Sequence, residues 1–414
     1  MTTQSQPSIG ELHQPFFGPQ CQDPAPFYAH ARHAEPVFRS PALNMWVITR
    51  YDDVVRVLRD PATFSSRDAL GVRPPAAPEA EAIMATLTPI NHLLNADPPY
   101  HERLRDALNL AFTPSAVGAM EPSIRRIASE LIDAFCARGH ADLVADFALP
   151  LPLTVIFELF GIKREHMHQA HLWSVDLVQL AFGMPMTVER QVECAHSFVA
   201  MERFCRELAE SRMRNPGDDL ISRVLHPADP DVAALTVDEV IGQLPGFILA
   251  GHETTANLIG NLTRALLAEP AQWQRVTSDA RLRARAVEEA LRYDGSILGM
   301  LRTATADVEL GGAQLRAGDV MFLAFHSANR DETRFECPDE FRVERAKQGA
   351  HIGFGRGIHY CIGAPLARLE VAIALELMGS RLPGLRLVEG QSFARRQAFP
   401  GRGFEQLDIE WDVD

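Results

Sequence analysis

The sequence predicts a mostly α-helical protein of the α+β class, in which a small β region is kept apart from the helices. Three observations lead to this prediction. Apolar residues recur with helical spacing through most of the chain between about residues 100 and 379. Strand-like runs are short and gather near 36–50, 307–324 and the C-terminal tail. One helical stretch, 236–269, is long enough to cross a whole domain.

Strand and helix signals follow one another along the chain. Residues 36–50 alternate enough to predict a short β-hairpin, a helix follows at 52–59, and the Pro- and Ala-rich stretch 71–82 indicates a long loop. We expect helices at 100–112, 118–138, 152–160, 164–180, 188–213, 236–269, 280–293 and 364–380. We expect strands at 307–310, 320–324, 385–388 and 406–411.

The predicted helix 236–269 has clear boundaries. Thr236 and Glu239 have the spacing of a capping box, and Pro270 stops the helix at its other end. A helix of that length spans roughly 50 Å at about 1.5 Å per residue. It can therefore carry side chains to a buried centre. Pro245 lies inside it and should kink or loosen it, which affects where the residues before 246 point.

Composition and charge exclude several classes of protein. The net charge is −14, and Lys163 and Lys347 are the only lysines, which argues against a basic nucleic-acid surface. The N-terminus has no charged segment followed by an apolar one, and the longest apolar stretch contains Asp146 and Glu158. We therefore expect neither a signal peptide nor a membrane span. The expectation is a cytoplasmic monomer with an N-terminal tail, 1–22, and one domain, 23–414.

The six cysteines are scattered without a CxxC pair, which disfavours a disulfide framework or a zinc site. One of them, Cys361, stands in a glycine-rich segment, HIGFGRGIHYCIGAPL, just before a predicted helix whose first turn holds Pro365. The positive end of that helix and the exposed amides of the loop favour a thiolate. The loop lacks the spacing of a dinucleotide fingerprint, because Tyr360 occupies the third glycine position. A buried structural cysteine or a nucleophilic cysteine remains an alternative at this stage.

This segment resembles the haem-binding signature of the cytochrome P-450 family, with Phe354, Gly357, His359, Cys361 and Gly363 at its positions. The resemblance implies the fold of that family and a haem b whose iron has Cys361 as its axial ligand. It covers the chain from about residue 23 to the C-terminus. It implies a monooxygenase that uses O₂ and that receives the electrons of NAD(P)H only through other proteins.

A second motif, AGHETT, lies inside the long predicted helix. It is not the zinc motif HExxH, because Ala256 stands where the second histidine would be. Ala250 and Thr254 are four residues apart and share a helix face, and the Thr254 hydroxyl can bond back to the previous turn. The segment resembles the oxygen-activation motif of the same family. By that resemblance Thr254 hydrogen-bonds dioxygen and Glu253 delivers protons, which makes this pair catalytic.

Two further sets of residues fit the resemblance. Glu289 and Arg292 are three apart on a predicted helix and match the structural ExxR pair of the family. Four basic residues match the family's ligands for the haem propionates, and with Phe354 and Gly363 they complete the expected haem site. They are His101, Arg105, Arg302 and His359.

The substrate pocket is predicted to be apolar and roomy, with no basic residue that marks an acidic substrate. The residues expected to line it are Phe247, Ala250, Gly251, Ile297, Leu298 and Phe399, with lids at 71–96 and 180–187. We expect hydroxylation or epoxidation of a bulky apolar molecule such as a terpenoid, a steroid or a polyketide or macrolide. The chain has no nucleotide-binding fingerprint, so a ferredoxin and a ferredoxin reductase are the expected electron donors. Arg103, Arg356 and Arg368 are a hypothetical docking patch for the ferredoxin.

Three alternatives remain. A peroxide-driven peroxygenase and a nitric oxide reductase share the family's cysteine loop, but they tend to lack the acid that Glu253 supplies here. A non-catalytic haem carrier or gas sensor would leave Glu253 and Thr254 without a purpose.

Overall fold

The computed structural model describes residues 7–69, 76–88, 91–181, 186–346 and 350–413. Its main α-helices are α3 (Ala25–Ala34), α4 (Tyr51–Arg59), α5 (Pro78–Met84), α6 (Tyr100–Asn109), α7 (Pro114–Phe135), α8 (Pro150–Leu159), α9 (Met167–Ala181), α10 (Val188–Arg214), α11 (Leu220–Leu225), α12 (Val237–Leu267), α13 (Pro270–Ser278), α14 (Ala280–Tyr293) and α16 (Ala364–Arg381). Short helices are α1 (Ile9–Leu12), α2 (Pro19–Gln22) and α15 (Phe325–Ala328), with a π-helical turn η3 (Val144–Ala148) and 3₁₀ turns η1 (Leu93–Asn95), η2 (Cys136–Arg138), η4 (Arg164–His166) and η6 (Gly357–His359). The strands are β1 (Val37–Ser40), β2 (Met45–Ile48), β3 (Phe64–Ser65), β4 (His140–Asp142), β5 (Met300–Ala304), β6 (Val308–Leu310), β7 (Ala313–Leu315), β8 (Val320–Leu323), β9 (Arg386–Leu387) and β10 (Asp408–Glu410).

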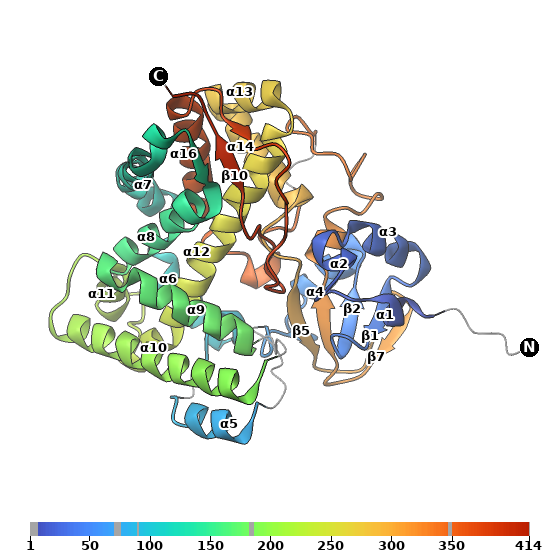
Figure 1. Cartoon of the computed structure of the whole chain (residues 1–414). Helices are drawn as coiled ribbons and strands as arrows, with labels where there is room; N and C mark the ends of the chain where they lie inside the picture. The colour runs from blue at the N-terminus through green and yellow to red at the C-terminus, as the bar shows by residue number, and fades with distance from the viewer. Residues whose placement is uncertain (1–6, 70–75, 89–90, 182–185, 347–349, 414) are drawn as a thin grey trace, which may run out of the picture.

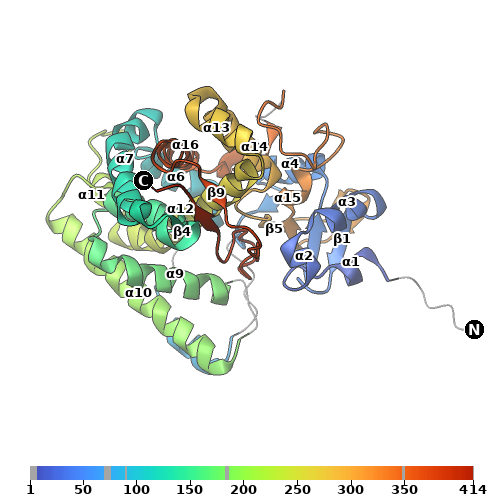
Figure 2. The ribbon, with the colours of Figure 1, turned by 45° about the horizontal axis from the view of Figure 1, so that its top comes forward.

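Most of the helices and the largest sheet occupy different sides of the molecule, as the sequence predicts, whereas the small C-terminal sheet lies among the helices (Figures 1 and 2). Helices α5 to α12 lie on one side, and β1, β2, β5 and β7 lie with helices α1 to α4 on the other (Figures 1 and 2). The largest sheet has five strands in the order β1-β2-β8-β5-β3. Its first pair is the predicted hairpin, antiparallel with Val37 opposite Ile48 and Ser40 opposite Met45. A three-stranded sheet, β4-β10-β9, joins the C-terminus to the segment before η3.

The central helix α12 confirms the prediction for 236–269. The Thr236 hydroxyl accepts a hydrogen bond from the Glu239 amide, and the Glu239 carboxylate accepts one from the Thr236 amide at 2.8 Å. Pro245 lacks the amide that would bond to the preceding turn. The helix nevertheless continues through it to Leu267. Because α12 packs against α8, α10, α14 and α16, its middle lies at the centre of the helical region (Figure 1).

Several predictions of local structure were incomplete. Residues 78–82, expected in a loop, begin helix α5, with Pro78 in its first turn, where its missing amide costs nothing. Strand β5 was not predicted, yet it is a central strand, paired with β8 and β3. Before residue 23, Ile9 and His13 are buried against the β region, and the boundary placed there stays a prediction. Among the described residues, none of the helices combines the length and the apolar character that crossing a membrane requires.

Candidate active site

The cysteine loop has the compact form that its glycines suggest. The Cys361 amide donates a hydrogen bond to the Phe354 carbonyl at 2.9 Å, which folds the loop back on itself ahead of α16. Gly357 has a backbone φ of +71°, which residues other than glycine rarely adopt. A side chain there would also collide with the backbone carbonyl of Leu58 at the end of α4. Gly357 therefore lets the loop lie directly against the β region.

The sulfur of Cys361 lies where α16 begins. Burial raises the pKa of the Cys361 thiol, while the backbone amides of Gly363 and Ala364 and the charges of Arg105 and Arg368 act in the opposite direction. The sequence led us to expect that the helix end and the amides favour a thiolate, and they do lower the pKa. Burial outweighs them, so a bound metal ion is what would hold this sulfur as a thiolate.

Four basic side chains gather beside the cysteine loop, as predicted. The ring centroids of His101 and His359 are 4.3 Å apart. Arg302 is 5% exposed, and burial lowers the pKa of its guanidinium to about 10. Burial and the neighbouring Arg302 lower the pKa of His359 to about 3. Arg105 donates a hydrogen bond to the Tyr360 carbonyl at 2.7 Å, which ties this cluster to the cysteine loop.

Three of these basic groups, His101, Arg302 and His359, have few or no acceptors among the described residues. Both ring nitrogens of His101 and Nε2 of His359 are buried without a hydrogen-bond partner. Arg302 donates one bond, at 2.6 Å, to the backbone carbonyl of Leu301. Buried donors and cations without acceptors are costly, so the cluster is suited to receive anionic oxygens. A haem b fits: its propionates match these donors, and Cys361 is the only thiol that the basic cluster adjoins in the described parts of the chain.

The middle of α12 presents Ala250, Glu253 and Thr254 on an accessible face, although the helix around them is buried. The Thr254 hydroxyl donates to the Ala250 carbonyl at 2.8 Å, which confirms the predicted bond to the previous turn. Burial raises the pKa of the Glu253 carboxyl, and the charge of Arg396 opposes that rise. A carboxyl with a raised pKa keeps its proton more readily near neutral pH, as a proton donor must.

Two of the expected pocket residues, Phe247 and Gly251, also contribute to helix packing. The ring of Phe247 stacks on Phe112 with centroids 5.9 Å apart and meets Phe160 edge-on, so it packs in the helical core. A side-chain atom at Gly251 would lie 2.9 Å from Ile156, so this glycine allows α8 to approach α12 closely. Both positions therefore take part in helix packing, and their place in a substrate pocket stays a prediction.

The other expected pocket residues lie close together. The Leu298 amide donates to the Pro400 carbonyl at 2.7 Å, and Ile297 forms a β-bridge with Gly401. This bridge brings the C-terminal turn back beside the segment after α14. The ring of Phe399 packs on Phe322 with centroids 5.0 Å apart. Leu298 and Phe399 line one small hollow, which they share with Arg396.

Glu289 and Arg292 form the predicted ion pair, at 2.8 Å and without solvent exposure. The sequence did not reveal its third member, Arg345, whose Nε lies 3.0 Å from the Glu289 carboxylate. Arg292 also donates to the carbonyls of Asn329 and Pro338. The cluster therefore fastens the segment that leads to the cysteine loop.

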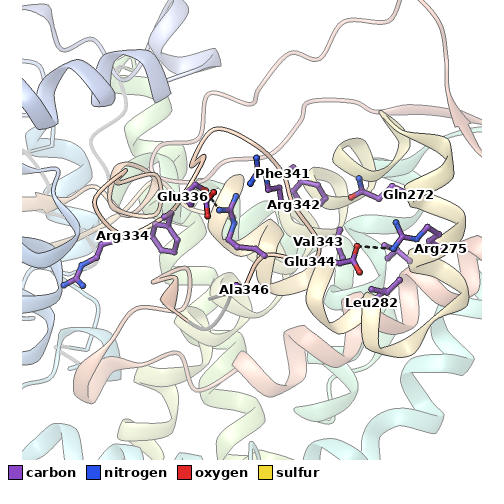
Figure 3. A pocket seen from close by; sticks show the side chains of 13 residues that line it. Gln272, Arg275, Leu282, Arg334, Glu336, Phe341, Arg342, Val343, Glu344 and Ala346 are labelled. Carbon is purple, nitrogen blue, oxygen red and sulfur yellow. Dashed lines mark hydrogen bonds and ion pairs between the residues drawn. The ribbon is translucent and has the colours of Figure 1, made fainter.

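A larger cavity, of about 580 Å³, lies between α13, α14 and residues 334–346 (Figure 3). An ion pair between Arg275 and Glu344 crosses its rim at 3.1 Å. Its lining among the described residues contains no part of the cysteine loop, α6 or α12. This cavity is therefore separate from the candidate site.

The fold and the site define the class as a haem-thiolate oxidoreductase. The sequence profile of the family described as "Cytochrome P450" matches residues 38–381. The chain is 36% identical over 418 residues to "Cytochrome P450 107B1" of Saccharopolyspora erythraea, and this alignment covers 99% of each of the two chains. It is 34% identical over 387 residues to "Polyketide biosynthesis cytochrome P450 PksS" of Bacillus subtilis, covering 91% of this chain and 93% of that one. A solved structure of cytochrome P450 CREJ in complex with (4-ethylphenyl) dihydrogen phosphate superimposes with a TM-score of 0.91 at 34% identity, over 98% of this chain and 100% of that one.

The chain belongs to the cytochrome P450 family. It is a monooxygenase that uses haem b and O₂, and enzymes of this family take electrons from redox partners. The predicted fold class is confirmed.

Proposed function

We propose that this enzyme places one oxygen atom of O₂ into a C–H or C=C bond of a bulky apolar small molecule, with Cys361 as the axial ligand of the haem iron. Terpenoids, steroids and polyketides or macrolides are the substrate classes, and the similarity to a polyketide biosynthesis enzyme supports the last of these. The observation that carries the proposal is the position of Cys361, under the amides of Gly363 and Ala364 and beside a basic cluster whose two histidines, His101 and His359, have buried ring nitrogens without a partner.

Hydroxylation consumes R–H, O₂, two electrons and two protons and yields R–OH and H₂O. Haem, when bound, supplies the activation of O₂, and the protein supplies the ligand, the protons and the pocket. Thr254, on the accessible face of α12, offers its hydroxyl to dioxygen, and Glu253, one residue earlier, offers the protons. His101, Arg105, Arg302 and His359 orient the haem by its propionates. The Glu253–Thr254 pair is also the reason to prefer this function over a peroxygenase, a nitric oxide reductase or a haem carrier.

A ferredoxin and its reductase are the proposed electron donors to a cytoplasmic, monomeric enzyme. The docking patch is weaker than the sequence suggested. Arg103 forms an ion pair with Glu239, and Arg368 forms one with Glu288 at 2.6 Å. Because partners already compensate these two charges, they contribute less to long-range attraction of an acidic protein than free arginines would.

The test of this function is the carbon monoxide difference spectrum of the dithionite-reduced holoenzyme. Thiolate ligation by Cys361 is expected to give a strongly red-shifted Soret band. A band at the position of histidine-ligated haem would contradict the assignment of Cys361. A folded protein that binds no haem would contradict the function as a whole.

Replacement of Thr254 by alanine tests the proton-delivery role. We expect haem to be retained, product formation to fall at least about tenfold, and the lost electrons to appear as hydrogen peroxide. Thr255→Ser is the matched control, because Thr255 is a buried neighbour and serine keeps its hydroxyl. The measurement is the ratio of product to NAD(P)H consumed. A Thr254→Ala variant that stays fully coupled would remove Thr254 from the mechanism.

A further inference from the structure

Arg396 is a basic residue of the pocket that the sequence analysis did not identify. It lies in the C-terminal segment that returns to the middle of the molecule beside α12 (Figures 1 and 2). Its backbone amide donates to the Gly403 carbonyl at 3.0 Å, and its Nη2 donates to Oδ1 of Asn257 on α12 at 2.7 Å. Because α12 and the neighbouring backbone both hold it, the guanidinium has a fixed position.

The guanidinium has unused capacity to donate. Its Nε is buried and has no hydrogen-bond partner among the described residues. Its sequence neighbours behave differently, because Arg395 and Arg402 both form ion pairs with the buried Asp294. Arg396 forms no ion pair with any carboxylate of the described residues. A half-buried cation with a missing acceptor is costly unless an anion completes its surroundings.

The surroundings of Arg396 combine polar and apolar groups. It lines one small hollow with Leu298 and Phe399, which are two of the apolar residues expected in the pocket, and the N-terminal Phe16 and the ion-paired Arg395 and Arg402 line the same hollow. The charged and titratable groups that its charge reaches are Glu253 and His252 on α12 and His171 on α9. Burial lowers the pKa of His252 to about 4, so this imidazole carries no competing positive charge near neutral pH.

Arg396 could instead act only on Glu253, as a positioning residue. The carboxylate of Glu253 lies close enough to Arg396 to feel its charge, but the two do not form an ion pair. A role confined to Glu253 would leave Nε without an acceptor, although Arg396 is the one arginine of this hollow that has no ion pair among the described residues. A ligand with an apolar body and an anionic end satisfies Arg396, Leu298 and Phe399 together.

We propose that the substrate of this enzyme carries an anionic group, a carboxylate or a phosphate monoester, which Arg396 receives while the apolar part lies against Leu298 and Phe399. This inference rests on the proposed function and narrows its substrate class. A charge-assisted, two-pronged hydrogen bond from a guanidinium to either anion increases affinity about tenfold to a hundredfold.

Probes anchored on the haem iron test this inference without knowledge of the substrate. Each probe carries an imidazole at one end, which binds the iron and shifts the Soret band, and a carboxylate, a phosphate monoester or a neutral methyl ester at the other. From Ala250 to Asn257 the helix rises about 10 Å, so tethers of roughly four to twelve methylenes cover the reach. Spectral titration of the holoenzyme gives a Kd for every probe, because the imidazole provides the signal in each case.

At the matching tether length, we expect the acid probe to bind at least about tenfold more tightly than its ester. The Arg396→Gln variant should lose this preference, Arg396→Lys should keep part of it, and Arg316→Gln, on the exposed β7–β8 turn, should keep all of it. Comparison of the carboxylate and phosphate series identifies the anion.

Two outcomes would overturn the inference: equal affinity for acid and ester at every tether length, or a preference that survives in Arg396→Gln. Either outcome leaves the proposed function standing, because the carbon monoxide band tests that function separately. A variant that failed to fold would show itself by losing the imidazole shift with the ester probe.

Discussion

The Cys361→Ala variant is expected to lose the red-shifted carbon monoxide band and all monooxygenase activity while it keeps its fold. The side chain of Cys361 accepts hydrogen bonds from the amides of Gly363 and Ala364, and the substitution removes these. The backbone bond from Cys361 to Phe354 and the start of α16 at Ala364 survive the substitution. Its loss therefore removes the thiolate and little else. Spectra and product assays on purified, haem-loaded protein make the measurement.

A second variant, at another cysteine, tests whether the loss expected for Cys361→Ala is specific to that residue. Cys136 is also a half-buried free thiol, and it lies between α7 and β4, away from the basic cluster. Cys136→Ala should keep the band and the activity. A Cys361→Ala enzyme that still shows the red-shifted band would mean that another residue holds the iron.

The parts of the site that the sequence predicted are those in which the interacting residues lie close together in the sequence. The cysteine loop is one, because its glycines, Pro365 and Cys361 all act within a dozen residues. The ion pair of Glu289 and Arg292 is another, because three residues bring side chains to one helix face. The bond from Thr254 to Ala250 spans one helical turn. In each case the backbone geometry of a regular element already determines the contact.

Contacts between distant segments could not be predicted in this way. Arg396 meets Asn257 across 139 residues, and Arg345 meets Glu289 across 56. The packing partners of Phe247 and Gly251 could not be predicted for a related reason. Adjacent residues of a helix point about 100° apart, so a pocket-facing Ala250 leaves Gly251 free to face another helix. In this structure α8 packs against Gly251, and the sequence alone does not give the position of α8.

The expected docking patch shows the same limit for charges. Position beside the cysteine loop suggested that Arg103, Arg356 and Arg368 act together on an acidic partner. The carboxylates that pair with Arg103 and Arg368 come from α12 and α14, far away in the sequence. Counting charges along the chain therefore gives the sign of a region's net charge. The electric field that a partner protein meets also depends on ion pairs between distant residues, and those form only in the folded protein.

Removal of Arg292 is expected to cost the protein about 3–5 kcal/mol in free energy of unfolding, because Glu289 is left charged and without exposure to water. Arg345 still forms an ion pair with Glu289, but the buried cluster loses one of its two cations, and the carbonyls of Asn329 and Pro338 lose their donor. The substitution is Arg292→Met, which keeps volume. The measurement is the denaturant dependence of unfolding at equal haem loading.

Comparison with a surface ion pair shows whether the buried cluster of Glu289, Arg292 and Arg345 contributes more to the free energy of unfolding. Arg126 forms ion pairs with Glu130 and Glu158 on the surface, and Arg126→Met should cost no more than about 1 kcal/mol. Arg292 also binds the carbonyls of Asn329 and Pro338, so its loss should loosen the segment before Cys361 and lower the fraction of protein that retains haem. If Arg292→Met and Arg126→Met cost the same, the buried cluster contributes no more than a surface pair. The cysteine loop would then owe its position to other contacts, among them the packing of Gly357 against Leu58.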